Sequence, residues 1–296
     1  MSSINTQKNI VLLGGDARQT TAVRLLLARG YRVSAFFGGG ENFDALPRCE
    51  SLESAIKDAD TVVLPLPVSV DGKTLNAPLC DERQIALSSI VDALTPRQTV
   101  VGGRIPESMV SVLSEKGIGV IDYFKSEAFQ IENAYTTSEA ALSIAMNNLK
   151  RNIRGASFAV TGYGRISRTL TDLLISLGGK TCVLARKESD LAWARLAGAR
   201  TMRLNAESIG QLTEGYDIIF NTVPTWLFFE DFLSSLNKDT LIIDLASAPG
   251  GVDVSAAKRL SSRVLWASSL PGKYAPESAG ELIANCIADI ISEGYV

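Results

Sequence analysis

Residues Ala156-Ser-Phe-Ala-Val-Thr-Gly-Tyr-Gly-Arg-Ile-Ser167 predict a strand that turns directly into a helix. The apolar run that ends at Gly162 is short enough for a buried strand, and apolar residues at helical spacing follow it: Ile166, Leu170, Leu173, Leu174 and Leu177. Gly162 allows a tight turn, and Gly164 allows a diphosphate to approach N–H groups at the positive end of the helix dipole. Ser167 stands where a third glycine usually lets the helix pack on the strand, and serine is small enough to keep that packing.

The residues after this turn favour a dinucleotide-binding domain. Gly178-Gly179 closes the helix, and Lys180–Ala185 reads as a second strand. Arg186 then stands about 20 residues beyond the glycines, where an Asp or Glu would bind the ribose 2′-hydroxyl of NAD. Arginine suits a 2′-phosphate instead, so the sequence predicts NADP, with NAD as the alternative. The competing interpretation is an ordinary glycine-rich turn with an arginine on the surface.

Later loops of small residues follow further predicted strands and can approach a nicotinamide closely. These strands are Asp217–Asn221, Thr240–Leu245 and Val264–Ala267, and Leu270–Lys273 reads as the loop after the last of them. The predicted cofactor-binding residues are Gly162, Tyr163, Gly164, Arg165, Ile166, Arg186, Lys187, Asn221, Thr222, Val223, Pro224, Ala246, Ser247, Leu270 and Pro271.

The composition is that of an ordinary soluble globular protein. The 296 residues suggest two domains, with 46% hydrophobic and 21% charged residues. A net charge of −3 without a basic block argues against nucleic acid or an anionic membrane as the main partner. No apolar run approaches the roughly 18 residues of a membrane span, and the polar start lacks a signal-peptide core. We therefore expect a cytoplasmic protein.

The chain contains no histidine and four widely separated cysteines. The missing imidazole excludes Ser-His-Asp and Cys-His catalysis and every His-ligated metal site, and no metal is predicted. A general acid or base must therefore be Asp, Glu, Lys, Tyr, Cys or water. The cysteines are expected to be free thiols that pack as small hydrophobic residues.

The first half of the chain also alternates strands with helices. Predicted strands are Ile10–Leu13, Tyr31–Phe37, Thr61–Leu66, Thr99–Val101 and Ile118–Ile121, and predicted helices include Leu52–Lys57, Ile85–Leu94 and Glu107–Lys116. Such alternation implies a parallel sheet with helices on both faces. The predicted fold is α/β, with two Rossmann-like doubly wound parallel-sheet domains and a cleft between them.

The predicted boundary between the domains lies at a helix. Thr136-Thr-Ser-Glu139 has the spacing of a capping box and precedes a helical apolar face. We expect residues 1–135 to form a substrate domain, residues 136–275 an NADP-binding domain, and residues 276–296 a helix that packs back across the domain interface. Glu139 is then a cap or a catalytic residue, and the cap is the simpler explanation.

Three loops of the first half are candidate substrate sites, and one of them is Gly102-Gly103-Arg104 after the strand Thr99–Val101. The turn Gly14–Arg18 follows the first strand, and Ser69 follows the two prolines at the end of another strand. Loops after strand ends line the crevice of doubly wound sheets. The alternative for Ser69 is a loop without a ligand.

The chain resembles the A subunits of dipicolinate synthase, a family of two-domain dehydrogenase-like proteins from spore-forming bacteria. The matching segments, spread over nearly the whole chain, are Gly14-Gly-Asp-Ala-Arg-Gln19, Leu64-Pro-Leu-Pro67, Asp71-Gly72, Thr74-Leu-Asn-Ala-Pro78, Gly162-Tyr-Gly-Arg-Ile166, Ala185-Arg-Lys187, Asn221-Thr-Val-Pro224, Ile243-Asp-Leu-Ala-Ser247, Pro249-Gly-Gly-Val-Asp253 and Ser269-Leu-Pro-Gly-Lys273. Departures are Ser167 for a usual glycine, Thr136-Thr-Ser-Glu-Ala140 for Pro-Thr-x-Glu-Gly, and Ala248 where a basic residue is common.

The resemblance implies oxidation of dihydrodipicolinate, from the lysine (diaminopimelate) pathway, to dipicolinate with NADP during sporulation. It further implies a flavoprotein-like partner, the B subunit of the synthase, together with a homo-oligomer and a place in the mother-cell cytosol. Arg18, Arg104 and Lys273 are the cations expected near the two substrate carboxylates, and the alternative for each of them is an ordinary surface charge. Asp16 and Glu139 are the candidate proton acceptors. Alternatives are a dehydrogenase of another small amino or hydroxy acid, or an NADP-binding protein without turnover.

Overall fold

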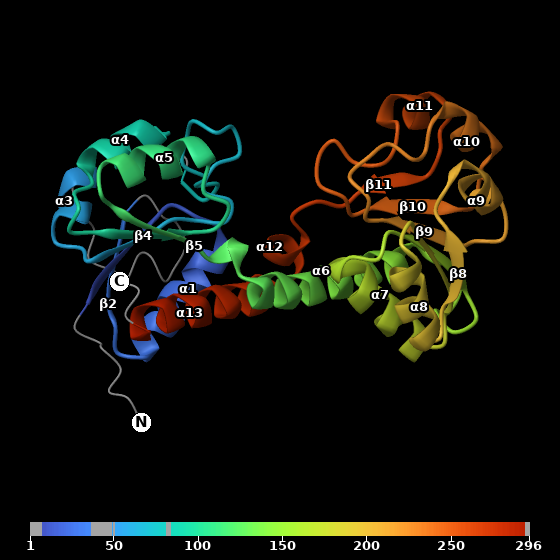
Figure 1. Ribbon diagram of the computed structural model, residues 1–296, viewed down its shortest axis with the longest axis horizontal. Coiled ribbons are helices and arrows are strands. Elements are labelled where there is room, and N and C mark those ends of the chain that lie inside the picture. The colour runs from blue at the N-terminus through green and yellow to red at the C-terminus, as the bar shows by residue number, and fades with distance from the viewer. Residues whose placement is uncertain (1–7, 37–48, 50, 81–83, 294–296) are drawn as a thin grey trace. The chain divides into compact units, whose positions relative to one another are not determined.

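The structure is a computed structural model that describes residues 8–36, 49, 51–80 and 84–293. It divides into two compact units. The first combines the chain up to Glu132 with the chain from Ala275 onward, and the second is the continuous segment Asn133–Tyr274. Both units are α/β structures, labelled in Figure 1.

The first unit is built on a five-stranded parallel sheet with the order β2-β1-β3-β4-β5. Its strands are β1 (Asn9–Leu13), β2 (Arg32–Phe36), β3 (Thr61–Val63), β4 (Thr99–Gly102) and β5 (Gly119–Asp122). Its helices are α1 (Ala17–Ala28), α3 (Leu52–Lys57), α4 (Leu87–Ala93), α5 (Glu107–Glu115), the short η1 (Tyr123–Lys125) and α13 (Pro276–Ser292). The strand order reverses between β1 and β3, which is the flavodoxin-like arrangement.

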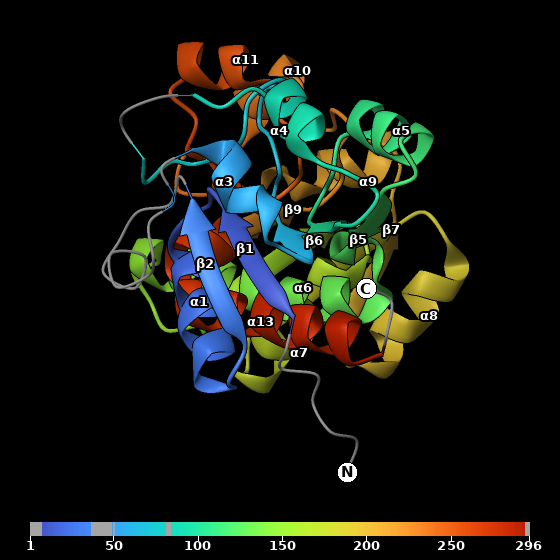
Figure 2. The ribbon, with the colours of Figure 1, turned by 90° about the vertical axis from the view of Figure 1, so that its left-hand side faces the viewer.

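Side chains of β1 alternate between two cores, as the period of a strand requires. Ile10 and Leu12 pack with α1 and α13 on one face, while Val11 and Leu13 pack with α3, α4 and α5 on the other. Figure 2 shows α1 and α13 side by side on one face of this sheet. Helix α13 packs closely on α1, and this packing requires glycine at position 280. A Cβ there would lie only 2.5 Å from the Arg18 carbonyl oxygen.

The second unit has a six-stranded parallel sheet with the order β11-β10-β9-β6-β7-β8. Its strands are β6 (Ser157–Thr161), β7 (Lys180–Ala185), β8 (Arg200–Arg203), β9 (Ile218–Asn221), β10 (Leu241–Asp244) and β11 (Val264–Trp266). Counted from β6, this is the Rossmann order 3-2-1-4-5-6. The prediction of two Rossmann-like doubly wound domains is therefore confirmed.

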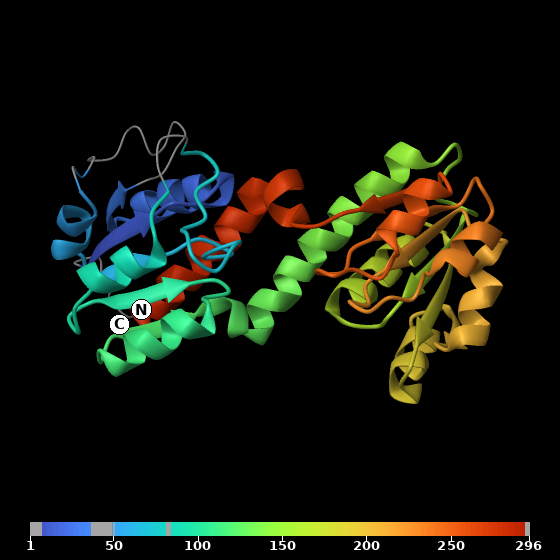
Figure 3. The same ribbon diagram turned by 90° about the horizontal axis from the view of Figure 1, so that it is seen from above.

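Two sets of helices cover the second sheet (Figure 3). One core contains residues of α6 (Glu127–Asn148), α7 (Arg165–Ser176), α8 (Glu188–Leu196) and α12 (Leu270–Tyr274). The other contains residues of α9 (Ala206–Gly210), η2 (Gln211–Thr213), α10 (Glu230–Ser235) and α11 (Val254–Arg259). Strands β6, β9 and β10 are buried on both faces, which explains their nearly continuous apolar runs.

Two sequence predictions of local structure were wrong. Helix α6 begins at Glu127, so Thr136 does not cap a helix but lies inside one. Thr137 and Ser138 bond back to the carbonyl oxygens of the preceding turn, at 2.8 and 2.9 Å. Hydroxyls that bond this way are accommodated within a helix, so the capping pattern was not specific. Residues Leu270–Lys273, predicted as a loop, belong to α12.

The units divide at Glu132/Asn133 and at Tyr274/Ala275, while the sequence placed boundaries at 135/136 and 275/276. Helix α13 packs on α1 within the first unit. Its expected position across a domain interface stays a prediction, as do the cleft and the substrate and cofactor roles of the domains. Phe37, the last residue of one predicted strand, lies outside the described residues.

Candidate functional site

The turn between β6 and α7 has the geometry that its two glycines predict. Gly162 has a φ of +89°, and a Cβ there would lie 2.5 Å from Thr222 Oγ1, so the position requires glycine. At Gly164, the N-cap of α7, no atom of the described residues lies within 4 Å of an added Cβ. The space that a side chain at Gly164 would fill is therefore open, and N–H groups at the start of a helix can hold an anion there.

A buried polar network fixes the loop after β9. Asn221 is fully buried, and its Nδ2 donates to Asp244 Oδ1 at 2.8 Å and to the Val223 carbonyl oxygen at 3.1 Å. Its Oδ1 accepts from Thr161 Oγ1 at 2.6 Å and from the Val223 N–H at 3.1 Å. Asn221 thus joins the ends of three strands and shapes the loop from inside.

Asp244 is the part of this network that the sequence analysis missed. It is 3% exposed, and its carboxylate also accepts from the N–H groups of Ala246 at 3.1 Å and Gly251 at 2.7 Å. The available signal was a single charged residue at the end of the apolar run Leu241–Asp244. The carboxylate holds the loop from Ala246 to Gly251 against β9.

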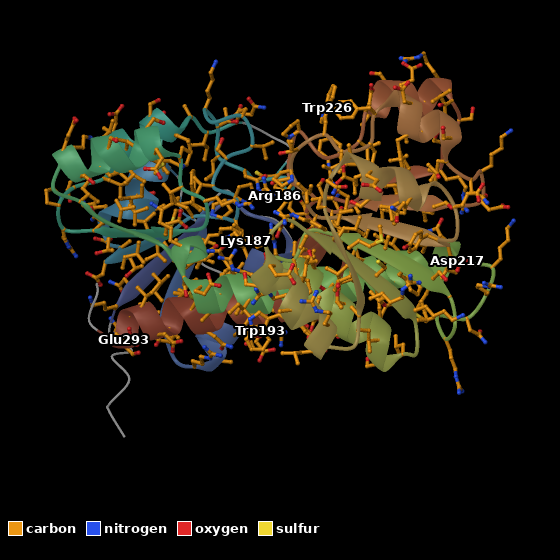
Figure 4. All side chains as sticks on the ribbon, turned by 45° about the vertical axis from the view of Figure 1, so that its right-hand side comes forward. Arg186, Lys187, Trp193, Asp217, Trp226 and Glu293 are labelled. Atoms are coloured by element: carbon orange, nitrogen blue, oxygen red, sulfur yellow. The ribbon has the colours of Figure 1, made fainter. Side chains whose placement is uncertain are left out.

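Beside the glycine turn between β6 and α7, the second unit contains a cavity of about 870 Å³. Among the residues that line it are Arg186, Leu204, Val223, Trp226 and Phe229. The rings of Trp226 and Phe229 pack edge to face, with centroids 6.0 Å apart, although both side chains are about half exposed. Neither aromatic residue was among the site residues predicted from the sequence. Figure 4 labels Arg186 and Lys187, adjacent at the end of β7, and Trp226 from the loop after β9.

The remaining predicted cofactor residues divide into exposed and buried ones. Arg165, Arg186, Lys187, Pro224 and Ser247 are exposed, Ile166 and Thr222 are half-buried, and Tyr163, Ala246, Leu270 and Pro271 are buried. The Tyr163 ring lies 5.2 Å from the guanidinium of Arg168, and burial raises the pKa of its hydroxyl. Tyr163 therefore stays a neutral apolar support for the turn.

In the first unit, Asp16 and Arg18 form an ion pair at the start of α1. Asp16 is the N-cap, and its Oδ1 accepts from the Arg18 N–H at 3.0 Å. The Arg18 guanidinium donates to Asp16 Oδ2 at 2.7 Å and also to the Leu66 carbonyl oxygen. Arg18 is only 7% exposed. The cation predicted to bind a substrate carboxylate thus already holds two partners of its own chain.

Three buried polar atoms of the first unit have no hydrogen-bond partner among the described residues, and one of them is Thr61 Oγ1 in β3. The other two are the Tyr123 hydroxyl and Gln19 Nε2. Burial raises the pKa of Tyr123, against the opposing effect of the Arg18 charge. Tyr123 therefore remains protonated.

Arg104 follows β4 in a left-handed backbone conformation, with a φ of +54°. Asp122 holds this backbone, because its two carboxylate oxygens accept from the N–H groups of Arg104 and Ile105, each at 3.0 Å. The guanidinium lies 4.5 Å from the centroid of the Phe124 ring. An exposed cation on a strained backbone at a strand end is typical of a binding position.

Ser69 donates to Asp71 Oδ1 at 2.9 Å, which also accepts from the N–H groups of Lys73 and Thr74. Hydrogen bonds from the Thr74 and Lys73 N–H groups, and then from the Thr74 and Ser69 hydroxyls, hold the pKa of Asp71 well below its ordinary value. In this state Ser69 stabilises its own loop.

Glu139 and Lys273 belong to the second unit. Glu139 is exposed on α6, and Lys273 is exposed on α12 beside a cavity of about 260 Å³ that Trp266 and Tyr274 also line. In the first unit, the fold brings Asp16 and Arg18 together, and Ser69 and Arg104 follow neighbouring strands of the sheet.

All four cysteines are free, and Cys182 is buried.

Comparison with known proteins adds to this geometry. Residues 9–124 match the model of the N-terminal domain of the dipicolinate synthase A subunit. The dipicolinate synthase A subunit of Bacillus subtilis (strain 168) is 26% identical over 293 residues, which are 97% of each chain. The chain resembles the A subunits of dipicolinate synthase over almost its whole length. The resemblance predicted from the sequence is thereby confirmed.

Solved structures support the same conclusion about the fold. The dipicolinate synthase A subunit from Bacillus halodurans has a TM-score of 0.87 at 24% identity, over 98% of this chain and 99% of that one. A transhydrogenase from Sinorhizobium meliloti has a TM-score of 0.68 at 14% identity, over 96% and 93% of the two chains. An L-alanine dehydrogenase has a TM-score of 0.63 at 11% identity, over 96% and 90%. The chain therefore has a dehydrogenase-like fold. Within the described residues, no helix has the length and apolar character needed to cross a membrane.

Proposed function

We propose that this chain is the dehydrogenase component of a dipicolinate synthase, which oxidises a dihydrodipicolinate to dipicolinate with NADP. The observation that carries the proposal is the open glycine turn at the start of α7, next to a cavity with Arg186 among its lining residues. The resemblance to the A subunits of dipicolinate synthase supports the choice of reaction. The dehydrogenase-like fold supports the choice of a nicotinamide cofactor.

The residues fit a dinucleotide. The N–H groups at the start of α7 would hold the diphosphate over Gly164, and the cavity would take the adenosine half between Leu204 and Val223. Arg186 would pair with the 2′-phosphate. The nearby carboxylate of Glu188 does not oppose this, because it forms an ion pair with Arg195 at 2.6 Å.

When bound, the nicotinamide supplies the acceptor for the hydride that the dihydropyridine ring releases. The ring also loses a proton, and the two losses make it aromatic. The protein then has to orient the ring and neutralise two carboxylates. Arg104, Lys273 and Arg18 are the proposed carboxylate partners, and Asp16 or Glu139 would accept the proton.

We propose that a second, flavoprotein-like subunit orders the substrate site, since the name of the relatives is that of one subunit in a synthase. Neither of the two proposed proton acceptors is committed to that role by its contacts among the described residues. Asp16 forms an ion pair with Arg18, and Glu139 is an exposed residue within α6. A homo-oligomer in the mother-cell cytosol of a sporulating bacterium completes the proposal.

The test is to titrate NADP onto the isolated chain by calorimetry, and then to follow NADPH formation from freshly generated substrate with and without the partner subunit. We expect the chain to bind NADP alone and to turn over fully only with the partner. A chain that binds no NADP contradicts the proposal. Binding without turnover in the presence of the partner would instead establish a non-catalytic NADP-binding protein.

A further inference from the structure

Ser167, the residue that replaces the third glycine of the turn, makes a specific hydrogen bond. It is completely buried, and its hydroxyl oxygen lies 2.7 Å from Thr222 Oγ1. Thr222 Oγ1 donates its proton to the Thr161 carbonyl oxygen at 2.9 Å. A hydroxyl has one proton to donate, so Ser167 must be the donor in its contact with Thr222.

This chain of bonds crosses the point where the strand order reverses. Ser167 is in the first turn of α7, and Thr222 is the first residue after β9. Strands β6 and β9 are neighbours in the sheet and belong to its two halves. The bonds from Ser167 to Thr222 and from Thr222 to Thr161 therefore tie the glycine turn to the loop of the other half.

The Ser167 hydroxyl lies close to the first glycine of the turn. A Cβ on Gly162 would lie 2.5 Å from Thr222 Oγ1 and 3.6 Å from Ser167 Oγ, so both hydroxyls lie close over the first glycine. Glycine at position 167 would remove the donor to Thr222 and leave the space of the hydroxymethyl group empty.

The two tied segments carry different parts of the proposed cofactor site. The start of α7 offers N–H groups to a diphosphate, and Val223, next to Thr222, lines the cavity that also includes Arg186. The bond from Ser167 thus sets the spacing between a diphosphate position and an adenosine position.

We propose that Ser167 is a positioning residue that holds these two positions at the spacing of an intact dinucleotide, and that it thereby selects dinucleotides over their halves. This inference rests on the proposed NADP site, and it assigns to Ser167 a role that depends on the ligand rather than on folding alone. A ligand that spans both segments gains from the fixed spacing. A ligand that reaches only the cavity does not.

The experiment compares two ligands on the same full-length variants by calorimetry. NADP spans both segments, and adenosine 2′-monophosphate reaches the cavity alone. We expect Ser167→Ala to weaken NADP binding about three- to tenfold, which is the range for losing one buried neutral hydrogen bond. The affinity for adenosine 2′-monophosphate should stay unchanged. Ser167→Gly restores the usual glycine, so it should fold and show the same selective loss.

Thr222→Val tests the pair, and Ser176→Ala is the matched control. Combining Ser167→Ala with Thr222→Val should weaken NADP binding no further than Thr222→Val alone, because both changes remove the same bond. Ser176 is an exposed serine on the same helix, and its removal should alter neither affinity.

Equal losses for both ligands would assign Ser167 a purely structural role and overturn the inference. Unchanged NADP affinity in both Ser167 variants would overturn it as well, while leaving the proposed function standing. If the unmodified chain binds neither ligand, the proposed function fails, and the inference fails with it.

Discussion

Asp16 Oδ2 lies 2.7 Å from Arg18 Nη2, and this contact closes the turn between β1 and α1. Because Arg18 also donates to the Leu66 carbonyl oxygen, the pair joins the turn to the loop after β3. A substrate carboxylate that binds Arg18 must therefore compete with Asp16. In the first unit, the residues proposed to bind substrate are therefore already held by contacts within the chain before any ligand binds.

We expect Arg18→Ala to lower the free energy of unfolding by about 2 kcal/mol, because it removes charge-assisted hydrogen bonds from a buried group. If Arg18 also binds a substrate carboxylate, substrate affinity falls roughly ten- to a hundredfold. Arg18→Lys keeps the charge without the planar fork and should recover part of the stability. Denaturant unfolding and substrate titration separate the two effects, and unchanged substrate affinity in Arg18→Ala would remove Arg18 from the site.

Arg186→Asp should shift cofactor preference from NADP towards NAD, since a carboxylate repels the 2′-phosphate and accepts from a 2′-hydroxyl. The measurement is the ratio of the two dissociation constants. Arg200→Asp makes the same charge change at the opposite end of the neighbouring strand and should leave the ratio unchanged. Equal binding of NAD and NADP by the unmodified chain would show that Arg186 does not select the cofactor.

Trp226→Leu should weaken binding of adenine-containing ligands roughly tenfold if the cavity holds the adenine as proposed, because an aromatic wall can stack on a base. Binding of NADP should also quench tryptophan fluorescence, and the quenching should be lost in this variant. Trp193→Leu serves as the control, since Trp193 is 60% exposed on α8 and does not line the cavity. Quenching that persists without Trp226 would place the adenine elsewhere.

Asn221→Ala should destabilise the fold by about 2 kcal/mol, because the buried Asp244 carboxylate loses a donor. The exposed Asn237, whose side chain accepts one hydrogen bond in a turn, provides the comparison. Its change to alanine should cost clearly less in the same denaturant experiment. A similar cost at both positions would mean that the buried network adds nothing to stability.

Asp71 makes the stability of its loop depend on pH. Its pKa in the folded chain is lowered, first by the Thr74 and Lys73 N–H groups, so the ionised form contributes stability above the ordinary value of 3.8. That contribution is lost as the pH falls below this value and through the lowered pKa. We expect the amide NMR signals of Lys73 and Thr74 to keep their positions at about pH 4 and to shift only in stronger acid. In Asp71→Asn this titration should disappear, and a shift near the ordinary pKa would contradict the assignment.

The strands other than β8 (Arg200–Arg203), and the glycine turn before α7, could be predicted because their signals are local. A short apolar run ending at Gly162 specifies both a strand and its turn. The capping spacing at Thr136 misled, because the same residues are compatible with the interior of a helix that begins at Glu127. That earlier start follows from packing, since Phe129 is buried with Tyr123 in the core of the first unit.

The parts of the site that sequence could not supply depend on contacts between distant segments. Trp226 lines a cavity whose other residues come from β7 onward, and nothing near Trp226 in sequence distinguishes it from a surface aromatic residue. Arg18 was recognised as a cation near a strand end, but its pairing with the Leu66 carbonyl oxygen joins residues 48 positions apart. Such pairings exist only after the sheet has formed.

The close packing of α13 on α1 also affects how the protein is made. The second unit is one continuous segment, so it can fold as soon as the ribosome has released it. The first unit must wait, because Ile283, Ile287 and Ile291 of its core are synthesised only after the whole second unit. During translation the apolar face of α1 therefore stays uncovered while the whole second unit emerges. A ribosome stalled before α13 would hold a nascent chain with one finished unit and one that exposes half of its core.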